Sequence, residues 1–152
     1  MAINRDFIGR TYEFDTPYQV GREKVREFAT AIGDQNPLYH DLDAARAAGH
    51  PDLVAPPTFP FVITYQAMIG VVADPELNVN YMMVVHGEQQ FTYTRPLYVG
   101  DEVVVHSLIK DISTVRRNEL ITMEQQVKTL DGDLIVTTRN VTVSRGTAPE
   151  EG

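Results

Sequence analysis

The sequence predicts an α+β fold in which helices come first and an antiparallel sheet follows. Three observations predict it. The residues before position 50 contain short segments with helical spacing, residues 61–72 are apolar almost all round, and alternating strand patterns begin near residue 81. A sheet curled around the apolar helix is the simplest arrangement that buries both elements.

Two helices are expected before residue 50. In the first, over residues 22–32, apolar side chains recur at i, i+3, i+4 and i+7, namely Val25, Phe28, Ala29 and Ile32. Gly33 follows where a helix ends in a left-handed residue. The second helix, over residues 42–48, has Asp41 as its N-cap and Gly49 just past its end.

The third helix differs because it has no polar face. Pro57 and Pro60 suit a first helical turn, and the segment FVITYQAMIGVV follows at 61–72. A helix that is apolar on every side is expected to be enclosed by the rest of the protein.

Strand patterns fill the second half of the chain. The expected strands are 90–94, 102–110, 121–128 and 134–144, with a short leading strand that includes Phe7 and Ile8. Asp131-Gly132 is a strong type I′ signal for the turn between the last two strands. One apolar helix and about four antiparallel strands make the layout of a hot-dog fold. Such sheets pair edge to edge or pack helix to helix in dimers, which also gives an exposed edge strand a partner. A homodimer or a heterodimer with a second hot-dog subunit is therefore expected.

Bulk properties set the class of protein. The 152 residues suit one domain, expected at 1–146 with a disordered tail at 147–152. The absence of cysteine excludes disulfides and thiolate chemistry, and the net charge of −8 argues against nucleic acid as a ligand. The longest apolar run, 59–72, is too short to span a membrane, and the N-terminus lacks the apolar core of a signal peptide. A soluble cytoplasmic protein is expected.

The polar stretch GDQNPLYHDLDAA, residues 33–45, is the strongest candidate for a functional site. As a turn, its Asp and Asn side chains bond to nearby backbone and Pro37 stops the helix. As an active site, Asp34 works with an imidazole, because acid–base catalysis needs a group that titrates near neutrality. Spacing alone leaves both interpretations open.

Other histidine and carboxylate groups give weaker signals. Structural or surface roles are expected for three histidines: His50, His86 and His106. His40 with Asp41 and Asp43 has the composition of a metal site, but the two aspartates are needed to cap and begin the second helix. No metal and no cofactor is therefore expected.

Two sequence blocks, in their order and spacing, carry a likeness to a known family. They are Phe28-Ala29 followed by Gly33-Asp34-Gln35-Asn36-Pro37-Leu38, and Phe91-x-Tyr93-x-Arg95-Pro96-x-x-x-Gly100-Asp101. With the apolar helix between them, the chain resembles the MaoC-like (R)-specific hydratases and dehydratases from about residue 7 to residue 144. The segments Ala55-Pro56-Pro57-Thr58-Phe59 and His86-Gly87-Glu88-Gln89 look like the small single-hot-dog proteins of actinobacteria. That group includes the substrate-binding subunits of heterodimeric 3-hydroxyacyl-carrier-protein dehydratases.

The resemblance implies a catalytic pattern that this chain matches only in part. Active members carry Asp-x-Asn-Pro-aliphatic-His, and a glycine N–H before the hot-dog helix binds the thioester carbonyl. This chain matches from Asp34 to Leu38, but Tyr39 replaces the histidine and His40 is displaced by one position. At the glycine position stands Pro57, which has no N–H to donate. Losing such a donor costs on the order of a hundredfold in rate.

Three hypotheses follow from the resemblance. In the first, the chain has an incomplete site of its own and forms the acyl channel of a heterodimer with a second hot-dog subunit. In the second, a homodimeric (R)-enoyl-CoA hydratase uses Asp34 with His40 or Tyr39. In the third, the chain binds an acyl thioester without turning it over. Thioester hydrolysis is disfavoured, since 58–72 contains no carboxylate.

The same resemblance implies a substrate and a set of binding residues. The ligand is an acyl-CoA or acyl-carrier-protein thioester. As the charge and the short apolar run already indicate, no nucleic acid and no membrane span are expected. The expected substrate-binding residues are Asn36, Pro57, Thr58, Phe59, Phe61, Tyr65 and Met68, with Phe59 at the mouth of the channel.

Overall fold

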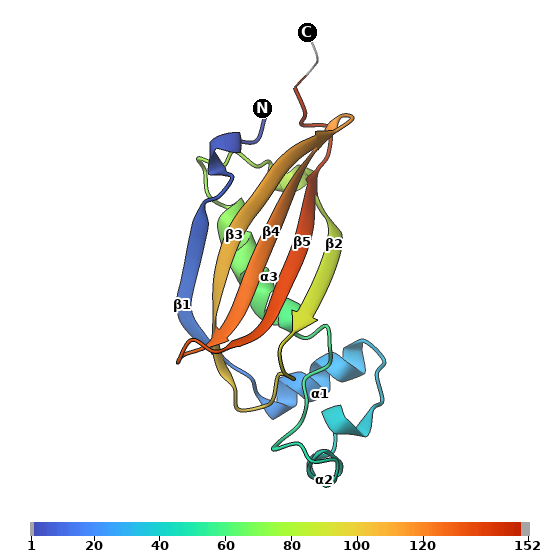
Figure 1. Cartoon of the computed structure of the whole chain (residues 1–152). Helices are drawn as coiled ribbons and strands as arrows, with labels where there is room; N and C mark the ends of the chain where they lie inside the picture. Colours follow the sequence, from blue (N-terminus) through green and yellow to red (C-terminus); the bar gives the residue numbers. More distant parts are fainter. Residues whose placement is uncertain (1, 150–152) are drawn as a thin grey trace.

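A computed structural model describes residues 2–149 and shows one antiparallel sheet curled around a central helix (Figure 1). The five strands are β1 (Thr11–Gln19), β2 (Val84–Tyr93), β3 (Glu102–Val115), β4 (Asn118–Thr129) and β5 (Leu134–Ser144). Their order in the sheet is β1-β3-β4-β5-β2, so β1 and β2 form its two edges. The predicted α+β class and the curled sheet are confirmed.

The helices occupy two places. Helix α3 (Pro60–Val72) lies inside the curl of the sheet, whereas α1 (Arg22–Ala31) and α2 (Leu42–Ala47) lie beyond the end at which β2 finishes (Figure 1). Three short 3-10 helices complete the set: η1 (Arg5–Phe7), η2 (Pro37–Tyr39) and η3 (Tyr81–Met83). Within residues 2–149, none of the helices combines the length and the apolarity needed to cross a membrane.

The predicted N-cap of α2 and the two glycines predicted to end the helices near the polar loop are confirmed. The Asp41 carboxylate accepts hydrogen bonds from the N–H groups of Asp43 and Ala44, so it caps α2. Gly33 and Gly49 follow α1 and α2 with φ of +74° and +91°. This left-handed conformation is the one that ends helices and favours glycine.

Three local predictions are wrong. Phe7 belongs to η1 and Ile8 caps it, because the Asn4 side chain accepts the N–H of Asp6 and starts a helical turn there. The first strand therefore begins only at Thr11. The β4–β5 turn is not type I′: Gly132 has a φ of +93° and donates to the Thr129 carbonyl, but Asp131 keeps an ordinary negative φ. Ile32 lies past the end of α1 and is 50% exposed.

Helix α3 is not enclosed on all sides as expected. Ile63, Ala67 and Val71 are buried. On the open side Tyr65 is 37% exposed, because one curled sheet covers only part of the helix surface. Pro60 begins the helix, and Pro57 precedes it.

A buried polar cluster ties α3 to the middle of the sheet. The Gln125 side chain is fully buried, and its amide nitrogen donates to the Thr64 carbonyl of α3 (3.2 Å) and to Ser107 Oγ (3.0 Å). Its oxygen accepts from Asn140 Nδ2 at 3.1 Å. These bonds offset the cost of burying the amide groups and hold the helix against β3, β4 and β5.

The segment after β5 stays close to the sheet as far as the structure describes it. The Ala148 N–H donates to the Arg117 carbonyl at 3.2 Å. Residues 150–152 of the predicted tail lie outside the described residues.

Candidate functional site

The loop between α1 and α2 is built by its own polar side chains. Asp34 Oδ1 accepts the N–H of Asn36 at 3.0 Å, and Asn36 Oδ1 accepts the N–H of Leu38 at 3.1 Å. The second bond begins η2, in which Pro37 occupies the first turn. Both polar residues therefore shape the turn, and Asn36 is exposed rather than turned into a pocket.

Helix η2 sends Tyr39 and His40 in different directions, since successive side chains of a 3-10 helix lie a third of a turn apart. Tyr39 points inward and is 8% exposed. The His40 ring turns back, and its Nε2 donates to the main-chain carbonyl of Asp34 at 2.8 Å. Arg26 Nε holds the His40 carbonyl at 3.0 Å. The His40 imidazole thus bonds to the main chain of Asp34 and not to its side chain. The Asp34 carboxylate accepts the Asn36 N–H.

Two phenols meet where the loop faces the start of α3. Burial raises the pKa of Tyr39, and the nearby Asp34 carboxylate raises it further. Tyr93, at the end of β2, donates its hydroxyl to the Pro57 carbonyl at 2.7 Å. Burial, and then the proximity of Tyr39, raises the pKa of Tyr93 as well. The structure therefore brings Asp34, Tyr39, Tyr93 and Pro57 together, with both phenols protonated at neutral pH.

A pocket of about 320 Å³ opens beside this group, and Pro57 and Tyr93 line it together with Arg95. Arg95 forms a two-pronged ion pair with Asp101, in which both N–O distances are 2.9 Å. The hydrogen bonds to Asp101 raise the pKa of Arg95. Asp101 also accepts the Tyr98 N–H at 2.8 Å, so this part of the second sequence block holds the β2–β3 connection in place.

A second pocket of about 460 Å³ lies between β2 and the start of α3. Its lining residues are Phe28, Thr58, Phe61, His86, Gln89 and Phe91. Phe61 meets the His86 ring edge to face at 5.2 Å, and the ring of Tyr65 lies 5.5 Å from Phe61. Of the predicted substrate-binding residues, Thr58 and Phe61 line this pocket, and Tyr65 packs on the Phe61 ring from the next turn of α3.

Two predicted positions differ in the structure. Phe59 is fully buried and packs on the Phe28 ring at 5.4 Å, so placing it at a channel mouth is wrong. Phe59 closes a turn immediately before α3, in which its N–H donates to the Pro56 carbonyl at 2.8 Å. Met68 is 7% exposed, and its sulfur accepts the Thr142 hydroxyl at 3.9 Å. It packs between α3 and β5, away from the lining of the 460 Å³ pocket.

Sequence reasoning did not assign site roles to Gln89, Phe91 and Tyr93. These residues are two apart on β2, which places them on one face of the strand. The alternation was readable in the sequence, but which face looks toward α1 and α3 depends on how the sheet curls.

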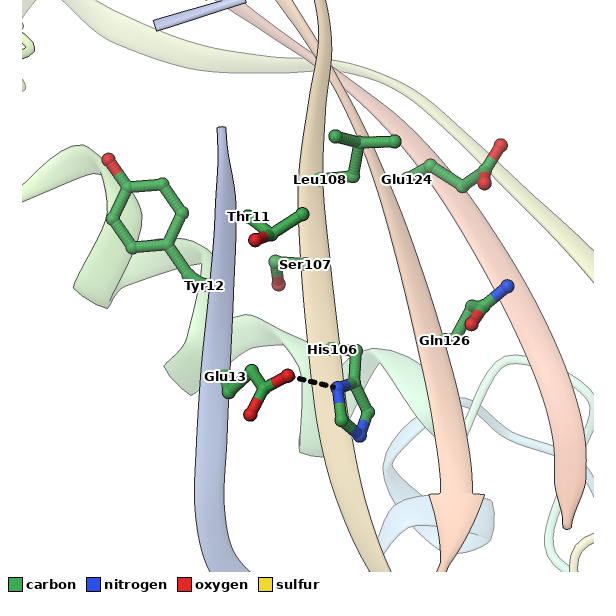
Figure 2. Close-up of a pocket in the computed structure, with 8 residues that line it drawn as sticks. All are labelled: Thr11, Tyr12, Glu13, His106, Ser107, Leu108, Glu124 and Gln126. Atoms are coloured by element: carbon green, nitrogen blue, oxygen red, sulfur yellow. Dashed lines mark ion pairs between the residues drawn. The ribbon is translucent and has the colours of Figure 1, made fainter. Parts of the chain in front are cut away.

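The histidine of β3 lies on the outer face of the sheet. In Figure 2 the Glu13 carboxylate points toward the His106 ring, and Oε1 and Nδ1 are 3.4 Å apart. A small pocket of about 220 Å³ surrounds them, with Glu124 and Gln126 on the neighbouring strand. Tyr12 points to the opposite side of β1. This pair is on the far side of the sheet from α3 and separate from the polar loop.

Comparison with known proteins shows which family the chain belongs to. A model of the FAS1-like dehydratase domain region matches residues 6–138. A protein of Thermobifida fusca named UPF0336 protein is 48% identical over 149 residues, which are 98% of each chain.

Solved structures share the fold. A MaoC-like dehydratase superposes with a TM-score of 0.84 and 31% identity, over 91% of this chain and 42% of that longer chain. A chain of the HadBC (3R-hydroxyacyl-ACP dehydratase) complex of Mycobacterium tuberculosis has a TM-score of 0.83 and 23% identity, over 91% of this chain and 97% of that one.

Proposed function

The chain belongs to the FAS1-like dehydratase family of hot-dog proteins, and from this premise we propose that it is the substrate-binding subunit of a two-chain dehydratase. The enzyme converts an (R)-3-hydroxyacyl thioester into a trans-2-enoyl thioester, or hydrates the enoyl thioester in reverse. This chain forms the acyl channel, and a second hot-dog chain supplies the catalytic pair.

The observation that carries this proposal is the chemistry at Tyr39 and Pro57. Dehydration removes a proton from C2 and the hydroxyl from C3, so it needs a base that is free at neutral pH and donors for the thioester oxygen. Tyr39 is buried with a raised pKa, so it keeps its proton. Pro57 offers a carbonyl, already bonded to Tyr93, where the family offers an N–H. An oxyanion would be repelled at this position.

The 460 Å³ pocket supports the binding role. Phe28, Phe61 and Phe91 give it aromatic walls, which suit an acyl chain. Tyr65, 37% exposed on α3, continues this apolar surface toward the sheet edge. An acyl group that enters between β2 and α3 would replace water on these rings.

The open edge of the sheet supports a second hot-dog chain. Within residues 2–149, β2 has a neighbouring strand on one side only. Exposed apolar side chains lie at its start: Tyr81 (56% exposed) and Met82 (83%) in η3, and Val85 (38%) on the strand itself. With Tyr65 they form a patch of the kind that marks a protein interface. The HadBC structure, which shares this fold, is a complex. A partner that pairs with β2 would also cover the open side of α3.

The alternative of a self-sufficient homodimer requires Asp34 to act with His40 or Tyr39. The His40 Nε2 is held by the Asp34 main-chain carbonyl at 2.8 Å, and Tyr39 stays protonated. Neither group is placed to accept a proton beside the Asp34 carboxylate. The geometry therefore favours catalysis by the partner.

Reconstitution tests the proposal. The chain is mixed with a hot-dog protein of the same genome that carries an intact Asp-x-Asn-Pro-x-His, and hydration of trans-2-enoyl-CoA is followed by absorbance. We expect the mixture to exceed the summed activities of the separate chains. Phe61→Ala in this chain should raise KM most for the longest acyl chains, whereas Leu130→Lys, on a distant turn, should leave KM unchanged. A stable complex without any gain in turnover would contradict the proposal.

A further inference from the structure

Four arginines gather at the end of the molecule opposite α1 and α2. This arginine end consists of Arg5, Arg116, Arg117 and Arg145, all exposed. The N-terminal segment, the β3–β4 turn and the end of β5 meet there (Figure 1). Arg5 donates to Thr114 Oγ1 at 2.5 Å, and Gly146 N–H donates to Asn118 Oδ1 at 3.1 Å, so these segments are in direct contact.

The arginine end stands out because the chain as a whole is acidic, with a net charge of −8. Within residues 2–149, no carboxylate lies within 4.0 Å of any of these four guanidinium groups. The buried Glu119 carboxylate on β4 is occupied by the Ile3 N–H at 3.0 and 3.1 Å. At the opposite end, by contrast, Arg22 and Arg95 are paired with Asp52 and Asp101.

The backbone of the β3–β4 turn strengthens the case for a binding role. Arg116 has a φ of +58°, a left-handed conformation that glycine and asparagine adopt far more readily than arginine. Arg116 and Arg117 alone connect the closing pair Val115 and Asn118, so the tightest point of the hairpin carries two guanidinium groups. Planar guanidinium groups bind phosphate oxygens through paired hydrogen bonds.

The arginine end lies too far from this chain's own polar loop to serve it. β2 pairs with β5 from Val84 opposite Ser144 to Tyr93 opposite Val136. Ten strand residues at about 3.3 Å each span roughly 30 Å. Arg145 is at the Val84 end, where its N–H donates to the Met83 carbonyl at 3.0 Å, whereas Tyr93 contacts Pro57 at the other end.

The arginine end is far from this chain's own polar loop, but pairing through β2 would bring it close to the catalytic loop of the partner. A second hot-dog chain that extends the sheet adds its own edge strand antiparallel to β2, in the two-fold arrangement usual for such dimers. The catalytic end of the partner then lies beside Val84, Met83 and the arginine end of this chain.

We infer that Arg116, Arg117 and Arg145 bind the phosphate of the 4′-phosphopantetheine arm that presents the thioester to the partner's catalytic loop. The placement beside the partner rests on the proposed function. The phosphate site itself is made by this chain alone. CoA and a carrier protein share this phosphate, and the acidic remainder of the surface directs either carrier to the arginine end.

Calorimetric titration of the purified full chain tests the inference with two probes, 4′-phosphopantetheine and unphosphorylated pantetheine. We expect the phosphorylated probe to bind at least tenfold more tightly, and added salt to reduce the difference. Arg116→Gln/Arg117→Gln/Arg145→Gln should abolish the preference. The control Arg22→Gln/Lys24→Gln/Arg46→Gln removes equal charge from α1 and α2 and should retain it.

A single variant gives an independent check. Arg116→Gly suits the left-handed φ, so it should raise Tm while it weakens binding of the phosphorylated probe severalfold. Equal binding of both probes to the natural chain would overturn the inference, as would a preference that survives the triple arginine substitution or is lost equally in the control. CoA and a holo carrier protein, titrated in parallel, distinguish the two sources of the phosphate. None of these readouts requires turnover. Failure of the reconstitution experiment can therefore be distinguished from failure of the phosphate-binding inference.

Discussion

Two phenols lie beside the Asp34 carboxylate of the polar loop and keep their protons at neutral pH. Tyr39 and Tyr93 have raised pKa values because they are buried, and the Asp34 carboxylate adds to the shift at Tyr39. A phenol with a raised pKa neither accepts a proton at neutral pH nor ionises to do so later. Tyr12, on β1, belongs to the same class: burial and its hydrogen bond to Asp74 raise its pKa to about 12.

Because the pKa values of these tyrosines are raised in the folded chain, we expect the free energy of unfolding to fall at high pH. The pKa of Tyr12 is raised above its unfolded value near 10, so its contribution is fully present below pH 10 and is lost as pH rises toward 12. In that window the free energy of unfolding falls by at most about 1.4 kcal/mol per pH unit for each such group.

Tyr12→Phe should therefore show a shallower decline between pH 10 and 11.5. Urea unfolding of both proteins across this range measures the slopes. Parallel curves would mean that Tyr12 ionises equally in the folded and unfolded chain.

Turn chemistry made part of the loop predictable from single residues. Asp34 and Asn36 bond to the backbone as their types suggest, and Asp41 caps α2. The directions of Tyr39 and His40 were not predictable, because they depend on the 3-10 geometry of η2 and on Arg26 of another helix.

Close contact between α3 and β1 sets the packing of the elements. Gly70 faces the Phe14 ring, and a Cβ at position 70 would lie 2.7 Å from one ring carbon. Overpacking costs about 1–3 kcal/mol, whereas alanine improves helix propensity by about 1 kcal/mol. Contact rather than propensity should decide the outcome.

Gly70→Ala is therefore expected to lower the free energy of unfolding by up to about 2 kcal/mol. In a Phe14→Leu background the shorter side chain leaves room, and the same substitution should become neutral or stabilising. Chemical denaturation of the four proteins gives the double-mutant cycle. An equal loss in both backgrounds would refute the contact as the cause.

Periodicity predicted the regular elements well where the signal is local. β4, β5, α1 and α2 follow from spacing and caps, and their ends differ by a few residues at most. The N-terminal segment was misread because two apolar residues, Phe7 and Ile8, carry no periodic signal. The open side of α3 depends on how far the sheet curls, which no local pattern states.

At the scale of the whole molecule, the β2 edge of the sheet lies beside the open side of α3. The proposed partner chain would cover both. Val85→Lys places a charge on that edge and should weaken association with a hot-dog partner at least tenfold without unfolding the chain. Leu130→Lys is the matched control. Leu130 is apolar like Val85 and 54% exposed, but it lies on the distant β4–β5 turn. Sedimentation velocity measures both. Equal affinities would place the interface elsewhere.

The central claim is that this chain binds the substrate but does not catalyse the reaction. The most direct test is to measure the enzymatic activity of the chain in the absence of a partner. Hydration of trans-2-enoyl-CoA by the purified chain is followed as loss of enoyl absorbance, with Asp34→Asn as control. We predict that the two proteins are equally inactive, at the rate of buffer. Turnover at ordinary enzyme rates that disappears in Asp34→Asn would contradict the account and make the polar loop an active site.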